Sequence, residues 1–387
     1  MDNFHIHPEV QELFDELVSL RRQIHMNPEL LYDLPITSKL VSDYLTSLGI
    51  EVHTQVGISG VVGVINNANG PCILLRADMD CLPIDEANNI PYKSKITGKM
   101  HACGHDSHTA MLMVAAKVIS RHRNQLKGSV KFFFQPAEEG GHGAREMIND
   151  ANYPVLDIEP KVDQVYAIHV ENFSKLGDYI LADKYMSCNS DALDIKITGK
   201  GGHMSAETNS PVNIGANLIL QLQTILSRNV SNKNRAVVSI TSFNAGSSVN
   251  TIPNLCQIKG TIRTFDSEIQ ELVHGRIRKI CEGVEIMNQC DIKVNIDKRY
   301  QPTENNEKCN EIALKILEKI CPEGVRDINS PMIGEDFFYL TKRCPGCYFL
   351  LSSGLENSIH SPNFDIDERV MLLGSSFFVD LIFNLLS

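Results

Sequence analysis

Residues 130–141 read Val-Lys-Phe-Phe-Phe-Gln-Pro-Ala-Glu-Glu-Gly-Gly, a short apolar run followed by two carboxylates and two glycines. The apolar part is typical of a buried strand, and we predict one over 130–135. The carboxylates follow the carboxyl end of this strand, where open parallel sheets bind their ligands. This stretch therefore predicts both a layered domain and the edge of the sheet that carries its site.

The same pattern continues on both sides of this stretch. We predict further strands over 61–65, 72–76 and 165–170, and helices over 9–25, 37–48 and 108–120. Strands that alternate with helices favour an α/β domain with a mainly parallel sheet. Polar clusters follow Arg76, Gln135 and Ile168, and we expect them to meet at one edge of the sheet.

The pattern changes near Tyr185, where apolar and polar residues begin to alternate. Half-buried strands are predicted over 192–197, 236–243 and 256–263, with helices over 212–226 and 268–281 between them. After about Tyr300 the pattern of helices and short apolar strands seen in the first part of the chain returns, with a helix over 307–320. We therefore predict a discontinuous larger domain, 1–185 and 298–387, and an inserted α+β domain with an antiparallel sheet, 186–297.

Composition and charge exclude several classes of protein. Lys and Arg number 36 against 47 Asp and Glu, a formal charge of −11, so we expect no nucleic acid partner. The longest apolar stretch, 370–386, contains Asp380 and Asn384, so we expect a C-terminal core helix and no membrane span. The 11 cysteines form no disulfide framework, and no secretory signal is visible. We expect a cytoplasmic protein.

Two clusters carry metal-binding side chains. Cys103 and His105 lie two residues apart in the run 101–108, and thiolate and imidazole both bind zinc and similar ions. A structural zinc site would need a second Cys/His pair nearby, and none follows. In an extended segment Glu138 and Glu139 point opposite ways, so one could bind metal while the other acts as a base. A solvated surface pair is the alternative.

Two further histidines are weaker candidates when each is taken alone. His169 ends the apolar stretch 165–170, where it could be either a metal ligand or a satisfied core histidine. His360 lies in the irregular stretch 359–365, where a lone histidine is usually without function.

A series of short motifs resembles a known family in sequence order. The motifs are RRQIHMNPEL (21–30), RADMDCLP (76–83), MHACGHD (100–106), QPAEE (135–139), GKGGH (199–203), VNTIP (249–253), GTIR (260–263), GEDF (334–337) and HSP (360–362). Together they resemble the hippurate hydrolase and N-acyl-amino-acid amidohydrolase family of the aminoacylase- and carboxypeptidase-like metallopeptidases. Each motif is weak alone, but their order over nearly the whole chain is specific.

The resemblance implies a binuclear metal centre in the larger domain, which would then be the catalytic one. The implied ligands are Cys103, His105, Glu139, His169 and His360. Cys103 would bridge two divalent ions, with zinc favoured by the mixed ligands and manganese, cobalt or nickel as alternatives. Glu138 would act as general base on a metal-activated water. Asp78 would hold a ligand imidazole in one tautomer.

The resemblance also assigns roles to the inserted domain. It implies a homodimer in which His203 reaches the partner's active site and stabilises the tetrahedral oxyanion. Asn250 and Arg263 are candidates to bind the product's α-carboxylate, with a strand-surface arginine as the alternative for Arg263. The stretch 204–211 lacks a Pro-His pair that the family usually has, which leaves the acyl group and amino acid open.

These observations predict a metal-dependent amidohydrolase that cleaves N-acyl-L-amino acids such as N-acetyl or N-benzoyl conjugates. A dipeptidase or an N-acetyl-diaminopimelate-type deacetylase would use the same metals, base and carboxylate clamp. A catalytically silent binding module of the same fold, or a redox sensor using Cys103, are alternatives of other classes. The complete set of ligands and base favours the enzyme.

Overall fold

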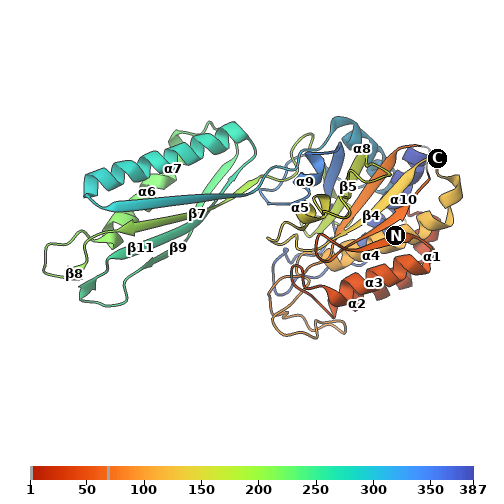
Figure 1. Cartoon of the computed structure of the whole chain (residues 1–387), viewed down its shortest axis with the longest axis horizontal. Coiled ribbons are helices and arrows are strands. Elements are labelled where there is room, and N and C mark those ends of the chain that lie inside the picture. The colour runs from red at the N-terminus through yellow and green to blue at the C-terminus, as the bar shows by residue number, and fades with distance from the viewer. Residues whose placement is uncertain (1–2, 68–69) are drawn as a thin grey trace. The chain divides into compact units, whose positions relative to one another are not determined.

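The computed structural model describes residues 3–67 and 70–387 and divides the chain into two compact units (Figure 1). The larger unit comprises Met1–Met186, Thr303–Ser330 and Asp336–Ser387, and the inserted unit comprises Ser187–Pro302 and Pro331–Glu335. The predicted boundary at residue 297 falls inside a strand that runs to Tyr300, so the inserted unit extends further than its alternation pattern indicated.

The larger unit is built on an eight-stranded sheet with the order β1-β2-β4-β3-β5-β14-β6-β13. Its strands are β1 (Glu51–Val56), β2 (Gly60–Ile65), β3 (Cys72–Asp78), β4 (Ser129–Gln135), β5 (Gln164–Glu171), β6 (Tyr179–Ile180), β13 (Arg326–Asp327) and β14 (Gly346–Ser352). The central strands β4, β3, β5 and β14 are parallel, whereas β1 and β2 add an antiparallel edge. The predicted α/β class is confirmed.

Side chains of β4 alternate between two buried faces, which explains its continuous apolar sequence. Phe132 and Phe134 join the main hydrophobic core. Lys131 points to the other face, where its ammonium donates to the carbonyl oxygens of Val155 at 2.7 Å and Ile158 at 2.9 Å. A fully buried lysine is tolerated here because two of its three ammonium donors have hydrogen-bond acceptors.

Helices cover the sheet of the larger unit. They are α1 (Pro8–Glu12), α2 (Phe14–His25), α3 (Pro35–Ser47), α4 (His105–Arg121), η1 (Arg123–Gln125), α5 (Gly143–Ile148), α8 (Glu307–Ile320), α9 (Phe338–Thr341) and α10 (Val370–Leu386). Helix α4 packs on β3 and β5 and is buried along nearly its whole length. Helix α10 packs on α4 and α8, as predicted for a core helix. Within the described ranges no helix combines the length and apolarity of a membrane span.

Two helix starts differ from prediction. Helix α3 begins at Pro35 rather than Thr37, and the Glu29 carboxylate accepts the backbone N–H groups of Ile36 at 3.0 Å and Thr37 at 2.8 Å. Helix α4 begins at His105 rather than His108, because Gly104 adopts a left-handed φ of 84° that turns the chain directly into the helix.

The inserted unit is an antiparallel sheet with two long helices on one face (Figure 1). The four strands follow the order β12-β7-β11-β9, and a separate pair joins β8 and β10. The elements are β7 (Asn189–Thr198), β8 (Gly202–His203), α6 (Pro211–Arg228), β9 (Ala236–Ala245), β10 (Thr251–Ile252), β11 (Leu255–Thr264), α7 (Ser267–Asn288) and β12 (Asp291–Tyr300). This confirms the predicted α+β class and adds β12, which the sequence reading missed.

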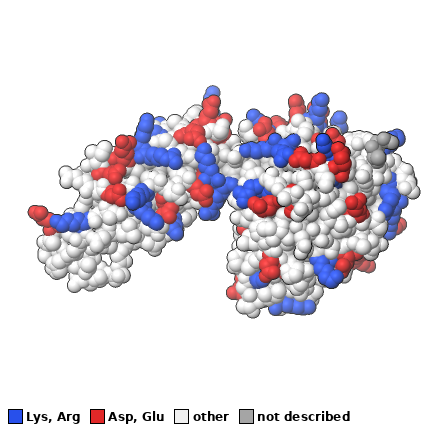
Figure 2. Space-filling view, viewed as in Figure 1, with Lys and Arg blue, Asp and Glu red and all other residues white. Residues whose placement is uncertain are grey.

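Charged side chains of both signs are interspersed on the face shown in Figure 2. At the end of the inserted unit that carries β8, this view shows acidic and basic groups at the tip and an uncharged area below them. An uncharged surface on an otherwise charged unit is a candidate for contact with another protein.

Candidate metal centre

The metal-binding candidates of the larger unit gather at the carboxyl ends of its parallel strands. Asp78 ends β3, Glu138 and Glu139 follow β4, and His169 lies near the end of β5. Because these three strands are parallel neighbours, their carboxyl ends share one edge of the sheet. The predicted position of the site follows directly from this topology.

Two groups of potential ligands meet at Cys103. Cys103, His105 and His169 form one group, and Cys103, Glu139 and His360 form another; in each, the ligand atoms lie within 4.8 Å of one another. The Cys103 sulfur lies 3.4 Å from Nε2 of His169, and Nε2 of His360 lies 3.3 Å from Oε1 of Glu139. The five residues named from the sequence are therefore brought together, with the thiol common to both groups.

The chemistry of these side chains fits divalent ions. Nδ1 of His105 donates to the Asp80 carbonyl oxygen at 2.8 Å, which leaves the Nε2 lone pair available, and Nε2 has no hydrogen-bond partner among the described residues. A backbone carbonyl behind a ligand imidazole is the usual arrangement in metal sites. Mixed sulfur, nitrogen and oxygen donors suit zinc and its neighbours. The residues present thus fit a binuclear centre.

The electrostatic field at this edge favours positive charge. Burial alone would lower the pKa of His105, but the Asp78 and Asp80 carboxylates raise it to about 10. Burial raises the pKa of the Cys103 thiol well above its usual value, and Glu139 and Glu138 add to this shift. Buried negative charge needs a compensating cation, so the site is electrostatically suited to a metal ion.

Asp78 contacts an imidazole that was not assigned as a ligand. Its Oδ1 accepts from Nδ1 of His108 at 2.6 Å, and Nε2 of His108 accepts from the backbone N–H of Val170 at 2.7 Å. The ring of His108 lies 4.7 Å from that of His169. Asp78 therefore fixes the tautomer of His108, while Nε2 of His105 lies farther from Asp78 Oδ2, at 3.7 Å.

The surroundings of Asp78 stabilise the ionised form of its carboxyl group. Burial would raise the pKa of its carboxyl, but Arg76, His105 and His108 outweigh burial and keep this pKa well below its usual value. Nη1 of Arg76 lies 2.7 Å from Oδ2 of Asp78.

Asp80 is a positioning residue that sequence reasoning missed. Its carboxylate accepts the backbone N–H groups of Glu138 at 3.0 Å and Glu139 at 3.2 Å. It thus holds the main chain between the proposed base and a proposed ligand. Asp80 lies two residues beyond the end of β3, and nothing in the sequence marked this contact.

The turn that carries the two glutamates is packed backbone against backbone. Ala137 has a left-handed φ of 54°. A Cβ on Gly143 would lie 1.6 Å from the carbonyl oxygen of Pro136. Asp336 accepts the backbone N–H of Ala144 at 3.1 Å and the Gln135 amide at 2.7 Å. The turn is therefore held at both ends.

Replacement of Asp80 by asparagine is expected to lower kcat/KM about 10–100-fold. The amide presents a donor where two backbone N–H groups now find acceptors, so the turn must shift. Amine release and metal content by mass spectrometry measure the effect. Asp85→Asn is the matched control, because Asp85 is exposed and accepts a hydrogen bond from the backbone N–H of Gly98. Equal activity of Asp80→Asn and wild type would refute the positioning role.

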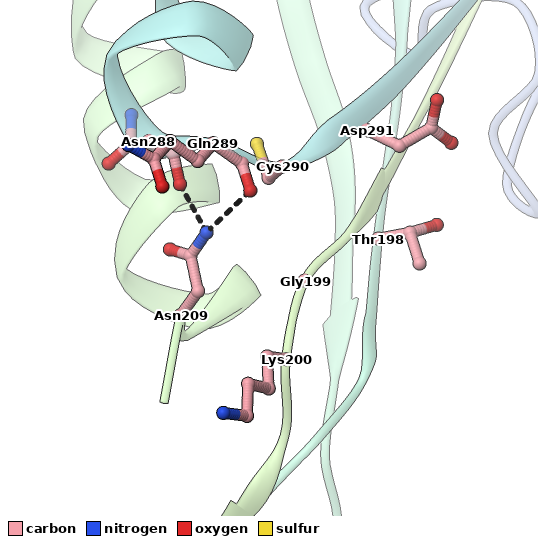
Figure 3. A pocket seen from close by; sticks show the side chains of 8 residues that line it. All are labelled: Thr198, Gly199, Lys200, Asn209, Asn288, Gln289, Cys290 and Asp291. Carbon is pink, nitrogen blue, oxygen red and sulfur yellow. Dashed lines mark hydrogen bonds between the residues drawn. The ribbon is translucent and has the colours of Figure 1, made fainter. Parts of the chain in front are cut away.

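His203 ends strand β8 of the inserted unit and leads into a loop whose two ends are held together. Lys200 pairs with Asn209 through two backbone hydrogen bonds of 3.2 and 2.9 Å. The Asn209 amide donates to the carbonyl oxygens of Asn288 and Gln289 at the end of α7 (Figure 3). The loop is thereby fastened to the inserted unit.

The tautomer of His203 follows from its neighbours. The backbone N–H of Ser205 donates to Nδ1 at 3.4 Å, and the Ser205 hydroxyl lies 2.7 Å from the same nitrogen. A neutral imidazole that accepts at Nδ1 carries its proton on Nε2, which is then free to donate.

The structure does not bring all the substrate candidates together within one chain. Thr251, next to Asn250, pairs with His203. Arg263 pairs with Ser190 near the start of β7, whereas Leu255 at the far end of β11 pairs with Thr198. Leu255 and Arg263 are eight residue steps apart along the strand, about 25 Å. Asn250 and Arg263 thus lie at opposite ends of the sheet, which the linear sequence did not reveal.

Comparison with known proteins identifies relatives of the whole chain. A sequence model described as peptidase family M20/M25/M40 matches residues 74–384. Hippurate hydrolase of Campylobacter jejuni is 37% identical over 379 residues, 97% of each chain. N-acetylcysteine deacetylase of Bacillus subtilis is 33% identical over 369 residues, 94% of this chain and 95% of the relative.

A solved structure supports the same grouping. The YXEP protein of Bacillus subtilis, described as a dinuclear metal binding peptidase from the M20 family, superposes with a TM-score of 0.82. It is 29% identical and the match covers 96% of this chain and 98% of that protein.

Proposed function

Because this chain belongs to peptidase family M20/M25/M40, we propose that it hydrolyses the amide bond of N-acyl-L-amino acids at a binuclear metal centre. The chain is a metal-dependent hydrolase of amide bonds, as its relatives are. The observation that carries the finer proposal is the pair of ligand groups that share Cys103 beside Glu138. The proposed metal is zinc, with manganese, cobalt and nickel as competitors.

The larger unit supplies the ligands and the base. Cys103, His105, Glu139, His169 and His360 would hold the two ions, which when bound polarise the amide carbonyl and acidify a water. Glu138, 8% exposed, takes a proton from the attacking water. The oxygen adds to the carbonyl carbon, the C–N bond breaks, and Glu138 returns the proton to the leaving amine.

The inserted unit supplies groups that bind the substrate. Arg263 offers a fork of donors that matches the α-carboxylate. His203 donates from Nε2 to the oxyanion that forms at the carbonyl, and Asn250 lies beside it. Because about 25 Å of strand separates Arg263 from the end that carries His203, one small substrate cannot contact both in a single chain. We therefore assign His203 and Asn250 to the site of a partner.

The surface of the inserted unit supports a homodimer as the partner. Strand β9 is the edge of the sheet and contains no charged residue from Ala236 to Ala245. Helix α6 contains none from Pro211 to Ser227, and its Leu220 is 69% exposed. Free edge strands normally carry charges that prevent pairing. An uncharged edge beside an uncharged helix fits a second copy of this chain.

The cysteines bear on the proposed cytoplasmic setting. All eleven lie in the described ranges and are free thiols. A reducing compartment would preserve them, Cys103 included.

The proposed function is tested with metal-loaded wild type on N-acetyl- and N-benzoyl-amino acids and on dipeptides, with amine release as the measurement. We expect turnover of at least one acyl-amino acid. Preference for dipeptides would identify a peptidase of the same chemistry. Inactivity of the metal-loaded protein on every substrate would refute the proposal and favour a binding module.

Leu220→Glu is expected to convert a dimer to a monomer in sedimentation velocity and to abolish activity, because His203 would no longer reach a partner. The introduced glutamate would bury a charge in the dimer interface, which would destabilise the dimer. Ile286→Glu is the matched control, because Ile286 is 72% exposed on α7. This variant should remain dimeric. A dimeric, active Leu220→Glu protein would contradict the assignment of this surface.

Complementation measures the exchange of His203 directly. Glu138→Gln and His203→Ala proteins are each expected to be nearly inactive, but their heterodimer contains one complete site. Activity should appear when the two are dissociated and reassociated together. Continued inactivity of confirmed heterodimers would show that His203 does not act across subunits.

A further inference from the structure

The segment that carries His360 has no secondary structure to fix it. It lies between the end of β14 at Ser352 and the start of α10 at Val370. His360 itself has a left-handed φ of 62°, and its side chain is 50% exposed. A non-glycine residue in this conformation persists only when its surroundings hold it. Other side chains must therefore determine where this imidazole lies.

A buried arginine near the start of the chain joins this segment to α4. Arg21 of α2 is fully buried. Its Nε donates to Oδ2 of Asp106 at 2.7 Å, and its Nη2 donates to Oδ1 of Asp365 at 2.8 Å. Asp106 follows His105 in the first turn of α4, and Asp365 lies five residues after His360. One guanidinium thus bridges the two ligand-bearing segments.

Other contacts make Asp365 a fixed point of the segment. The Tyr92 hydroxyl donates to its Oδ2 at 2.8 Å, and the Asn172 amide donates to its carbonyl oxygen at 2.9 Å. The backbone N–H of His360 donates to the carbonyl oxygen of Ala102 at 2.7 Å, next to Cys103. The segment is therefore seated against the stretch that contains Cys103 and His105.

The bridge requires the geometry of arginine. The guanidinium offers five donors in a rigid fork and can bind two carboxylates in different directions. A lysine ammonium is a point charge and cannot reproduce both contacts from one position. His25 also bonds Asp106, with its Nδ1 at 2.7 Å from Oδ2, so α2 holds the start of α4 at two points.

We propose that Arg21 is a positioning residue for the metal centre. Through Asp106 and Asp365 it places the His360 imidazole beside Cys103 and Glu139, the other members of its ligand group. This inference rests on the proposed role of His360 as a ligand. It assigns a function to the motif at residues 21–30, none of whose residues belongs to the ligand groups at Cys103.

The test measures metal binding by the full-length apo protein. Zinc binding is titrated by calorimetry and checked by mass spectrometry for wild type, His360→Ala, Asp365→Ala and Arg21→Lys. We expect two ions in wild type. In each variant the affinity for one ion should fall about 10–100-fold, while the other ion binds unchanged.

Controls separate positioning from a general loss of structure. Arg22→Gln is the matched control, since Arg22 is the adjacent arginine but is 42% exposed and pairs with Glu368. It should bind both ions like wild type. In a His360→Ala background, Asp365→Ala should cause no further loss of affinity. Thermal unfolding of the apo variants shows whether each is folded. A purely structural role would weaken the binding of both ions equally.

Two results would overturn the inference, and they differ. If Asp365→Ala and Arg21→Lys bind both ions as wild type does while His360→Ala does not, the positioning role is refuted and the ligand assignment stands. If His360→Ala also binds both ions normally, the assignment of His360 fails and the inference fails with it. Neither result depends on turnover, so the proposed hydrolysis is judged separately.

Discussion

Replacement of Glu138 by glutamine is expected to lower kcat by about 10²–10⁴-fold, the usual contribution of a general base. Glutamine has the same shape but cannot accept the proton of the attacking water. The backbone N–H of residue 138 still donates to Asp80, so the turn should keep its position. Both ions should bind as in wild type, and the measurement is single-substrate kinetics with metal content determined on the same sample.

Glu139→Gln is the matched control because it is adjacent and of equal size. Glu139 belongs to a ligand group with Cys103 and His360, so its replacement should weaken metal binding, and excess metal should restore part of the activity. Glu138→Gln should keep its metal and should not respond to excess metal. A Glu138→Gln protein with activity within tenfold of wild type would exclude Glu138 as the base.

Periodicity and motif order predicted much of the larger unit correctly. The α8 and α10 bounds coincide with the predicted helices, because apolar spacing along a helix is a local property of the chain. The alternation of strands and helices also predicted the sheet edge at which the candidate site lies, since parallel strands end at one edge of the sheet. The side chains grouped at Cys103 are those named from the sequence.

The supporting contacts could not be predicted from the sequence. Asp80 binds backbone N–H groups 58 and 59 residues away, and backbone donors leave no mark in a sequence. Arg21 meets Asp365 at a separation of 344 residues, and its motif has no spacing that names this partner. The separation of Asn250 from Arg263 depends on strand register, which a single sequence does not specify.

Removal of the metal ions is expected to abolish hydrolysis, with a loss of about 10³-fold or more, because the ions stabilise the transition state by several kcal/mol. Chelation followed by dialysis should give an inactive protein, and added zinc should restore activity in proportion to the ions bound. Manganese, cobalt and nickel, added separately, show which metal supports the fastest turnover. Full activity at a metal content far below one ion per chain would contradict the binuclear proposal.

Cys103→Ala provides the sharper version of this experiment, because its sulfur belongs to both ligand groups. We expect this variant to lose both ions and to remain inactive after zinc is added. Replacement of His169, which belongs to one group only, should weaken one ion. Cys72→Ala is the matched control, since Cys72 is also buried but lies outside the ligand groups.

Ions that bind only the native state raise the unfolding midpoint. Added zinc should therefore stabilise wild type and Cys72→Ala against heat but not Cys103→Ala, and binding of two ions by Cys103→Ala would exclude a shared thiolate.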